Sequence, residues 1–489
     1  MSVYKQAVVI SSGQVEPNRP PPGLGFLAGV CANNNLPYEP FDLNIYILHK
    51  LGQNLWTELY HYTSVFKGDN ESLNNIIDKL LDSFVETILE VKPDIVMITV
   101  LTYWQNFWTK KLLEKLKDHD VVTVAGGPGI SIEYETNKTF GRYLCDNNLL
   151  DYYVLGEGDL ALDQFLKNNI ELGLNSKTDK FETWAPQIED LNAAPFRTYK
   201  KINVEDYKTY DSSGAIAVTS SRGCVRRCTF CDVGTIWKKF RFRSAENVVK
   251  EIKQHYEEVG ETNFFFTDSL INGSIKNFIK FMEEIVKLKE TVPGFDSFRY
   301  SGQFIVRHMT QHPEYMYQLM QKSGYYNVQV GVETGSDRVR AHMQKKFTNA
   351  DLDYHMEMCN KYGLTNTLLM LIGYPTETIE DFQESLDMIK RYQKYLLDGT
   401  LIDISDSLPL MVLKNTPLHD LAHELGMNLN DEYINLDWVA DTNPDLTVKE
   451  RWRRFIVYQR ELIRLRYPRP AEMEIRLMQY IDEVKKLKE

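Results

Sequence analysis

Three cysteines within eight residues constrain this chain more than any other feature. They lie in the stretch GCVRRCTFCD as Cys224, Cys228 and Cys231, a C-x3-C-x2-C spacing with Phe230 directly before the last thiol. Three thiolates on one short loop can bind one face of an iron–sulfur cluster, and they supply three of the four ligands that a [4Fe–4S] cluster takes. One iron then stays open, so the spacing predicts a loop built for substrate or cofactor chemistry rather than for electron storage.

Two other interpretations of the cysteines fit the sequence less well. A structural zinc site usually needs four ligands in two pairs, but there is no second cysteine pair and no histidine within twenty residues of Cys231. A disulfide is disfavoured because the other cysteines, Cys31, Cys145 and Cys359, are scattered singly, and we predict these three to be small core residues.

Length and composition limit the number of domains, the cellular compartment and the class of partner. A chain of 489 residues predicts two or three domains, and 43% apolar residues can fill their cores. Six cysteines fit a reducing compartment, so we expect a cytoplasmic protein. The N-terminus predicts no signal peptide, and no apolar window is long enough for a membrane span. A net charge of −12 disfavours nucleic acid as the main partner.

In the first 185 residues, apolar runs alternate with amphipathic helical patterns such as 73–88. The alternation predicts a Rossmann- or flavodoxin-like, doubly wound α/β domain whose ligands lie beyond the carboxyl ends of parallel strands. Glycine-rich loops at these ends allow a close approach of backbone to a ligand, although such turns also use glycine for structure alone. The strands expected are Ala7–Ser11, Ile95–Leu101, Val121–Ala125 and Tyr152–Leu155, and the loops are PPPGLG (20–25), GGPG (126–129) and GEGD (156–159).

From Ala215 the alternation resumes and predicts a partial (β/α)6 TIM-type barrel, in which the chemistry lies at the carboxyl strand ends. The cysteine loop follows its first strand. The expected strands begin near Ala215, Asn263, Phe298, Asn327, Asn366 and Leu401; the expected helices are Ala245–Val259, Ile275–Lys289, Glu314–Lys322, Asp337–Lys345 and Ile379–Leu396.

The cysteine spacing with its aromatic residue, together with GVETGSDRV and TLLMLIGYPTET, resembles radical S-adenosylmethionine (SAM) enzymes. The resemblance implies that Cys224, Cys228 and Cys231 hold a [4Fe–4S] cluster whose open iron is chelated by the amino and carboxylate groups of SAM. It also implies that reduced cluster cleaves SAM to methionine and a 5′-deoxyadenosyl radical, which abstracts hydrogen from the substrate.

The same resemblance assigns cofactor contacts at the other strand ends. Glu333 would accept hydrogen bonds from the SAM ribose or ammonium; helix capping is the weaker interpretation because Ser336 and Asp337 can serve as caps. Asp268 and Ser269 either accept from the SAM amino group or cap the following helix. Further candidates are Phe230 and Gln303, which shares a face with Arg307 if its strand extends that far. Leu371 and Ile372 either contact adenine or belong to the core, and Gly373, also a cofactor-binding candidate, shapes the turn that follows.

The first 185 residues resemble the cobalamin-binding-type domain that precedes many radical SAM barrels. The resemblance rests on PPPGLGFLAG, DIVMITVLT, VVTVAGGPG and VLGEGD, and it gives cofactor-binding roles to Thr102, Gly126, Gly127, Gly156 and Glu157. The chain lacks Asp-x-His-x-x-Gly, whose histidine ligates cobalt in other cobalamin proteins. Either cobalamin binds without a histidine ligand, which we favour, or the domain keeps the fold without the cofactor.

We therefore expect a cobalamin-binding-type domain (1–185), a linker (186–212), a radical SAM barrel (213–415) and a C-terminal helical region (416–489) that either closes over the barrel or only packs on it. The expected activity is a cobalamin-dependent methyltransferase acting on an unactivated carbon or phosphorus of a small molecule or peptide, with flavodoxin or ferredoxin as electron donor. A radical rearrangement, cyclisation or oxidation is the alternative, and an iron–sulfur electron carrier or scaffold is the alternative from another class. The sequence around the cluster loop is rich in cations: Arg222, Arg226, Arg227, Lys238, Lys239, Arg241 and Arg243. These side chains form a solvated face, favour reduction of the cluster, bind the SAM carboxylate or a substrate phosphate, or contact the reducing partner.

Overall fold

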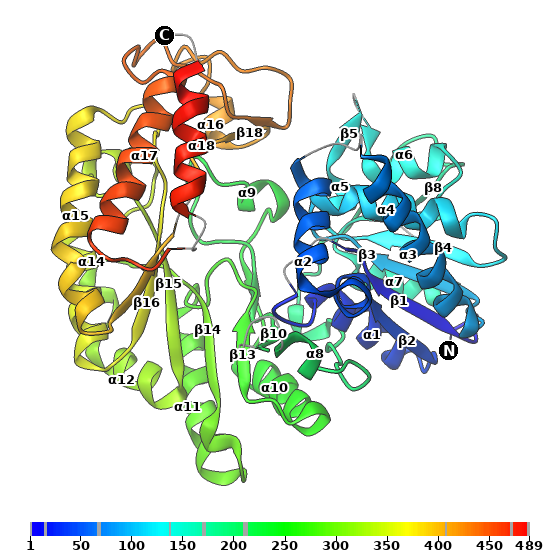
Figure 1. Cartoon of the computed structure of the whole chain (residues 1–489). Helices are drawn as coiled ribbons and strands as arrows, with labels where there is room; N and C mark the ends of the chain where they lie inside the picture. The colour runs from blue at the N-terminus through cyan, green and yellow to red at the C-terminus, as the bar shows by residue number, and fades with distance from the viewer. Residues whose placement is uncertain are drawn as a thin grey trace. The chain divides into compact units, whose positions relative to one another are not determined.

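The alternating apolar runs form two sheets in the computed structural model, which describes residues 2–13, 17–65, 70–135, 138–168, 173–208, 214–405, 408–469 and 473–486. By its internal contacts the chain divides into two units, Met1–Val218 with Lys250–Asn263, and Thr219–Val249 with Phe264–Glu489. Figure 1 shows the elements of each unit. Residues 209–213, around the end of the predicted linker, lie outside the described part of the chain.

The first sheet confirms the doubly wound prediction. Its five neighbouring parallel strands follow the flavodoxin-like pattern, in which the order reverses between β1 and β3 and ligands bind beyond the carboxyl ends near that point. The strand order is β2 (Tyr38–Asp42), β1 (Ala7–Ser11), β3 (Ile95–Thr99), β4 (Val122–Gly126), β7 (Tyr152–Gly156) and β8 (Leu174–Ser176), with β9 (Trp184–Ala185) also on β7 and only β8 antiparallel.

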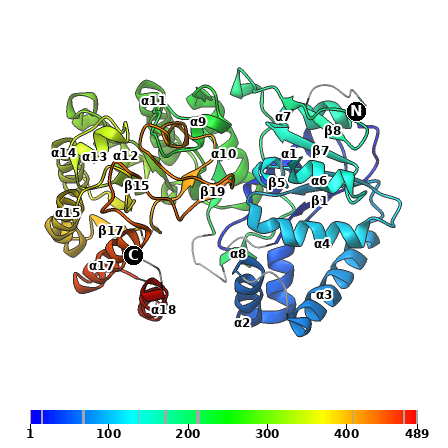
Figure 2. The ribbon, with the colours of Figure 1, turned by 90° about the horizontal axis from the view of Figure 1, so that it is seen from above.

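Local sequence explains why these elements form. All five residues of β1 are buried, as expected for a parallel strand covered on both faces. The helix α3 (Glu71–Glu90) is capped by Asn70, whose side chain accepts a hydrogen bond from Leu73 N at 3.2 Å. Helices α2 (Leu43–Val65), α3 and α4 (Asn106–Leu116) gather on one side of this unit (Figure 2), while α1 (Pro22–Asn33) packs against β1, β2 and β3.

Several strands differ from the sequence prediction. The strand β2 was missed because Pro40 stands at its centre. Proline is tolerated there because β2 is an edge strand, paired with β1 alone among the described strands. The predicted strand from Ile95 ends at Thr99, two residues early. The strands β8 and β9 lie where the loss of periodicity gave no strand signal.

The second sheet confirms the six predicted barrel strands in their predicted order. They are β10 (Ile216–Val218), β13 (Asn263–Phe266), β14 (Arg299–Phe304), β15 (Tyr325–Glu333), β16 (Thr365–Met370) and β17 (Leu401–Ile404). The connecting helices are α10 (Ala245–Val259), α11 (Ile275–Thr291), α12 (Glu314–Ser323), α13 (Asp337–His342), α14 (Asn349–Lys361) and α15 (Ile379–Leu397). The sequence prediction missed α14, although Thr348 and Asp351 form a capping box at its start.

The chain after the barrel strands combines short strands and helices: β18 (Val412–Leu413), α16 (Pro417–Asp420), β19 (Ile434–Asn435), α17 (Val448–Arg464) and α18 (Met473–Lys486). The apolar face predicted on α17 is present, since Phe455 and Ile456 form a buried cluster with Met473 and Leu477 of α18. Among the described residues, none of the helices combines the length and apolarity that a membrane crossing requires.

The segment 197–199, within the predicted linker, is held by α10. Glu251 Oε1 accepts a hydrogen bond from Arg197 N at 3.0 Å, and Glu258 accepts from Thr198 Oγ1 at 2.9 Å and Tyr199 N at 3.1 Å. These bonds explain why most of α10, which follows the first barrel strand in sequence, belongs to the first unit.

Candidate functional site

The cysteine loop begins at the carboxyl end of the first barrel strand, as predicted. The short strands β11 (Ser221–Arg222) and β12 (Arg241–Phe242) pair and close the base of a loop that carries all three cysteines and α9 (Val233–Ile236). Gly223 has φ +83°, and a Cβ there would lie 2.6 Å from Lys239 O, so the loop requires glycine at this point. The three thiols are free and half-buried.

The cysteine loop offers three thiols on one short stretch of chain. In the described part of the chain, no three His, Cys, Asp or Glu side chains converge as one metal ion requires. A cubane cluster makes a different demand, because each cysteine binds a different iron. Burial raises the pKa of the Cys231 thiol to about 12, and ligation releases that proton because the thiolate is the ligand.

Cations face the thiols from three elements. Arg226 lies between Cys224 and Cys228 in the loop, Arg307 follows β14, and Lys345 follows α13; each interacts electrostatically with at least one of the three thiols. Burial lowers the pKa of both arginines, because a guanidinium away from water loses solvation. Negative charge on the thiolates would compensate these cations.

Asp268 anchors the strand that leads into the cysteine loop. Its buried carboxylate accepts hydrogen bonds from Ser220 N at 2.9 Å, Ser220 Oγ at 2.7 Å and Ser221 Oγ at 2.6 Å. Burial raises the pKa of Asp268 despite these bonds. The helix-capping interpretation is wrong, because α11 begins at Ser274, whose side chain accepts from Asn277 N. The neighbouring Ser269 is half-buried.

Glu333 ends β15 in a strained conformation. Its φ is +69°, which is costly for a residue with a side chain and is often found at functional positions. Its carboxylate pairs with the buried Lys345 at 2.9 Å. Burial alone lowers the pKa of Lys345, but Glu333, Cys228 and Cys231 hold it above the ordinary value. As predicted, the α13 cap is Ser336 and not Glu333.

The pair of Glu333 and Lys345 places a carboxylate and an ammonium beside the cysteine loop. These two charges complement the amino and carboxylate groups of an α-amino acid, so the site fits the methionine part of SAM. Lys345 was not predicted as a site residue because the expected helix ran to that residue, whereas α13 ends at His342.

The turn after β16 is fixed by α17. Gly373 has φ +81°, and a Cβ there would lie 2.8 Å from Arg451 Cγ. Glu377 accepts from Gly373 N at 3.3 Å and pairs with the buried Arg454 at 2.9 Å. Burial raises the pKa of Glu377 to about 7, against the opposing effect of Arg454.

The other predicted residues of the barrel are placed as follows. Ile372 is buried and Leu371 packs against a core cluster that also contacts Phe230. Gln303 is exposed in β14, and the strand ends at Phe304, so Gln303 and Arg307 do not share a strand face. Arg307 donates instead to Asn272 O at 2.9 Å and Gly273 O at 3.1 Å.

The predicted cofactor residues of the first unit gather at one edge of its sheet. They follow three neighbouring strands: Thr102 after β3, Gly126 and Gly127 at β4, and Gly156 and Glu157 at β7. Gly127 has an internal reason to be glycine, because a Cβ would lie 2.5 Å from Val100 O. Glu157 is buried and accepts from Ile188 N at 3.0 Å. At Gly126 a Cβ would make an ordinary van der Waals contact with Val154 Cβ at 3.7 Å, so the surroundings do not require glycine there.

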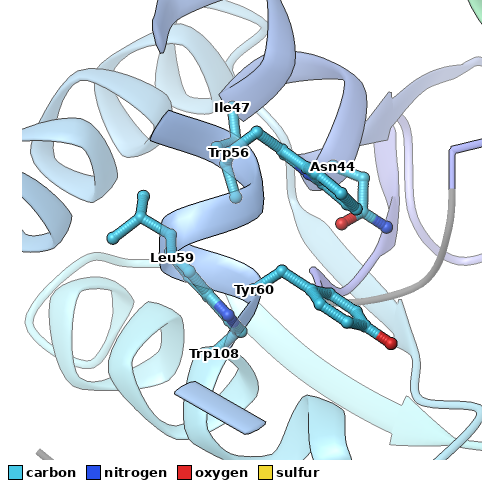
Figure 3. Close-up of a pocket in the computed structure, with 6 residues that line it drawn as sticks. All are labelled: Asn44, Ile47, Trp56, Leu59, Tyr60 and Trp108. Carbon is cyan, nitrogen blue, oxygen red and sulfur yellow. The ribbon is translucent and has the colours of Figure 1, made fainter. Parts of the chain in front are cut away.

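A small pocket of the first unit contains none of the predicted residues. It lies between α2 and α4 and is lined by Asn44, Ile47, Trp56, Leu59, Tyr60 and Trp108 (Figure 3). The rings of Trp56 and Tyr60 stack within it, with centroids 5.3 Å apart.

Comparison with known proteins agrees with these observations. Residues 218–389 match the radical SAM superfamily. The chain is 26% identical over 327 residues to an uncharacterized methyltransferase, PH0819, of Pyrococcus horikoshii, covering 64% of this chain and 68% of that protein. It is 25% identical over 420 residues to cytidylyl-2-hydroxyethylphosphonate methyltransferase of Streptomyces wedmorensis, covering 75% and 72%.

Solved structures share the fold along nearly the whole chain. The radical SAM methyltransferase TsrM of Kitasatospora setae aligns with a TM-score of 0.65 and 16% identity, covering 96% of this chain and 90% of TsrM. The cobalamin-dependent radical SAM enzyme OxsB aligns with a TM-score of 0.68 and 14% identity, covering 98% and 71%. Cysteine loop, barrel strands and sequence match together show that residues 218–389 of this chain belong to the radical SAM superfamily.

Proposed function

We propose that the chain is a radical SAM enzyme that uses a [4Fe–4S] cluster and cobalamin to methylate an unactivated carbon or phosphorus centre. The observation that carries the proposal is the position of the three free cysteines, on one loop at the carboxyl end of the first barrel strand, with Glu333 and Lys345 beside them. Relatives named as methyltransferases, one of them acting on a phosphonate, support the reaction type.

In this proposal Cys224, Cys228 and Cys231 hold the cluster, and Glu333 and Lys345 orient the amino acid part of SAM. The turn Leu371–Gly373 lies against the adenine. When bound, the cofactors supply a 5′-deoxyadenosyl radical that abstracts hydrogen and a methyl group for transfer. The chain itself positions the substrate and excludes water from the radical.

We further propose that residues 1–185 hold cobalamin, that 186–212 link the domains, that 213–415 form the barrel and that 416–489 complete it. The support is the fold shared with the cobalamin-dependent enzyme OxsB and the glycines at the carboxyl ends of β4 and β7, Gly126 and Gly156. No histidine is assigned to cobalt. A flavodoxin or ferredoxin of the cytoplasm would supply the electron, and a small molecule or peptide would receive the methyl group.

Anaerobic reconstitution with iron and sulfide, followed by dithionite and SAM, tests the radical chemistry. We expect 5′-deoxyadenosine from the wild type and none from Cys228→Ala, with Cys359→Ala, a buried cysteine outside the loop, as the matched control. Failure of SAM to alter the EPR spectrum of the reduced cluster, together with the absence of 5′-deoxyadenosine, would overturn the proposal.

Growth with hydroxocobalamin before purification tests the second cofactor. We expect a visible corrinoid spectrum at about one equivalent per chain. A purified protein with a full cluster and no corrinoid would leave the radical chemistry standing and remove cobalamin from the proposal.

A further inference from the structure

Thr229, inside the cysteine loop, makes hydrogen bonds to residues that lie far from it in sequence. It lies between Cys228 and Phe230 and is 1% exposed. Its N donates to Met343 O at 3.2 Å, its Oγ1 shares a hydrogen bond with Tyr374 OH at 2.8 Å, and its O accepts from Leu418 N at 2.7 Å. One residue of the loop is thereby tied to three other segments of the second unit.

Each of these partners belongs to an element that is itself fixed. Met343 is the residue that follows α13, and its side chain is buried. Tyr374 is in the turn after β16, where α17 holds Gly373 and Glu377 through Arg451 and Arg454. Leu418 is in α16 and is fully buried. Thr229 is therefore held by three buried neighbours.

The elements tied together are those proposed to hold the reactants. The loop carries the cluster ligands, the β16 turn carries the adenine contacts, and the residues after α13 carry Lys345. A buried hydroxyl pair of this kind fixes distance and orientation, because leaving either partner unbonded costs the desolvation of that group.

We propose that Thr229 is a positioning residue that fixes the cysteine loop against the β16 turn and the C-terminal segment 416–464, and so sets the affinity for SAM. The proposal rests on the proposed function. It also gives the C-terminal segment a role, since α16 and α17 hold the geometry of the cofactor site from outside the part that matches the superfamily.

Thr229→Val tests the proposal because it keeps the shape and removes the hydroxyl. We expect the three cysteines to take up a full cluster, but SAM to bind about tenfold more weakly when titrated by its effect on the EPR spectrum. Thr229→Ser should restore the wild-type affinity. In the apoprotein, hydrogen exchange of the loop peptide around 224–231 should be faster in Thr229→Val than in the wild type.

Tyr374→Phe removes the same bond from outside the loop, together with the longer bond from Tyr374 OH to His342 O at 3.4 Å, and carries the test if the valine variant does not fold. We expect at least the loss of SAM affinity seen in Thr229→Val, and a double variant that matches Tyr374→Phe, because the two changes share one interaction. Tyr300→Phe is the matched control: its buried hydroxyl bonds Ser323 at 3.0 Å in the same unit, and its loss should leave SAM affinity unchanged.

Two outcomes distinguish the positioning role of Thr229 from the proposed function. Lower stability with unchanged SAM affinity in Thr229→Val and Tyr374→Phe would overturn the positioning role while the radical chemistry stands. A wild type that neither binds SAM at its cluster nor forms 5′-deoxyadenosine would overturn the proposed function, and this inference with it.

Discussion

At the scale of single residues, the cluster loop is distinguished by charge as much as by its thiols. Arg226 and Arg227 are neighbours in sequence but differ in environment. Arg226 is half-buried and interacts with Cys224 and Cys228, whereas Arg227 is exposed and donates to Lys238 O at 3.3 Å. Only the first can act strongly on a cluster, because solvent screens an exposed charge.

Arg226→Gln should therefore lower the reduction potential of the cluster. Adding an electron increases the negative charge beside Arg226, and a neutral side chain stabilises that charge less. We expect a tenfold change in the reduction equilibrium, which is about 59 mV for one electron, measured by EPR-monitored redox titration. Arg227→Gln should stay near the wild type; an equal shift in both variants would contradict a local effect of Arg226.

At the scale of elements, α17 and the β16 turn are joined by a buried ion pair with an unusual pH response. Glu377 has a pKa raised to about 7 by burial, with Arg454 opposing and Asp381 adding to the shift. A carboxyl with a raised pKa stabilises the fold most when protonated, and this contribution is lost as the pH rises from about 4.5 through 7.

Glu377→Gln should remove this dependence. Between about pH 5 and pH 8 the free energy of unfolding of the wild-type apoprotein should fall, relative to the variant, by on the order of 2 kcal/mol. Urea unfolding at both pH values measures the difference. Glu380→Gln, an exposed position in the same stretch of chain, should not alter the wild-type trend, and a wild-type trend that persists in Glu377→Gln would show that other groups cause it.

Most helices and strands could be predicted from the sequence, and a few could not. Periodicity predicted every barrel strand because burial follows a local pattern along the chain, and the cysteine spacing predicted the cluster loop. It missed β2, where Pro40 hides an edge strand, and α14, where the capping box at Thr348 was the available signal. Lys345 and Thr229 could not be predicted, because their partners lie in segments that only the tertiary fold brings near.

At the scale of the whole molecule, the segment 197–199 within the predicted linker is held by α10. Glu258 accepts two hydrogen bonds from the segment at Thr198 and Tyr199. Neighbouring Glu257 is exposed and pairs only with Lys253, at 3.7 Å, among the ion pairs of the described residues.

Glu258→Ala should open the link to protease. Loss of two bonds to a charged acceptor raises the population of locally open chain about tenfold or more, so trypsin should cut at Arg197, Lys200 and Lys201 faster than in the wild type. Glu257→Ala is the matched control and should be cut at the wild-type rate. Equal cleavage of the two variants would mean that α10 does not hold the link.

The place of α10 has a consequence for synthesis on the ribosome. The first unit includes residues 250–263, and these are made after the first barrel strand and the cysteine loop. At about 5–20 residues per second, synthesis from the first barrel strand to the last helix of the first unit takes several seconds. The three cysteines are made before that helix. Cluster loading before residue 263 emerges would therefore meet a chain whose two units are both unfinished, so we expect insertion of iron and sulfide to follow translation and not to accompany it.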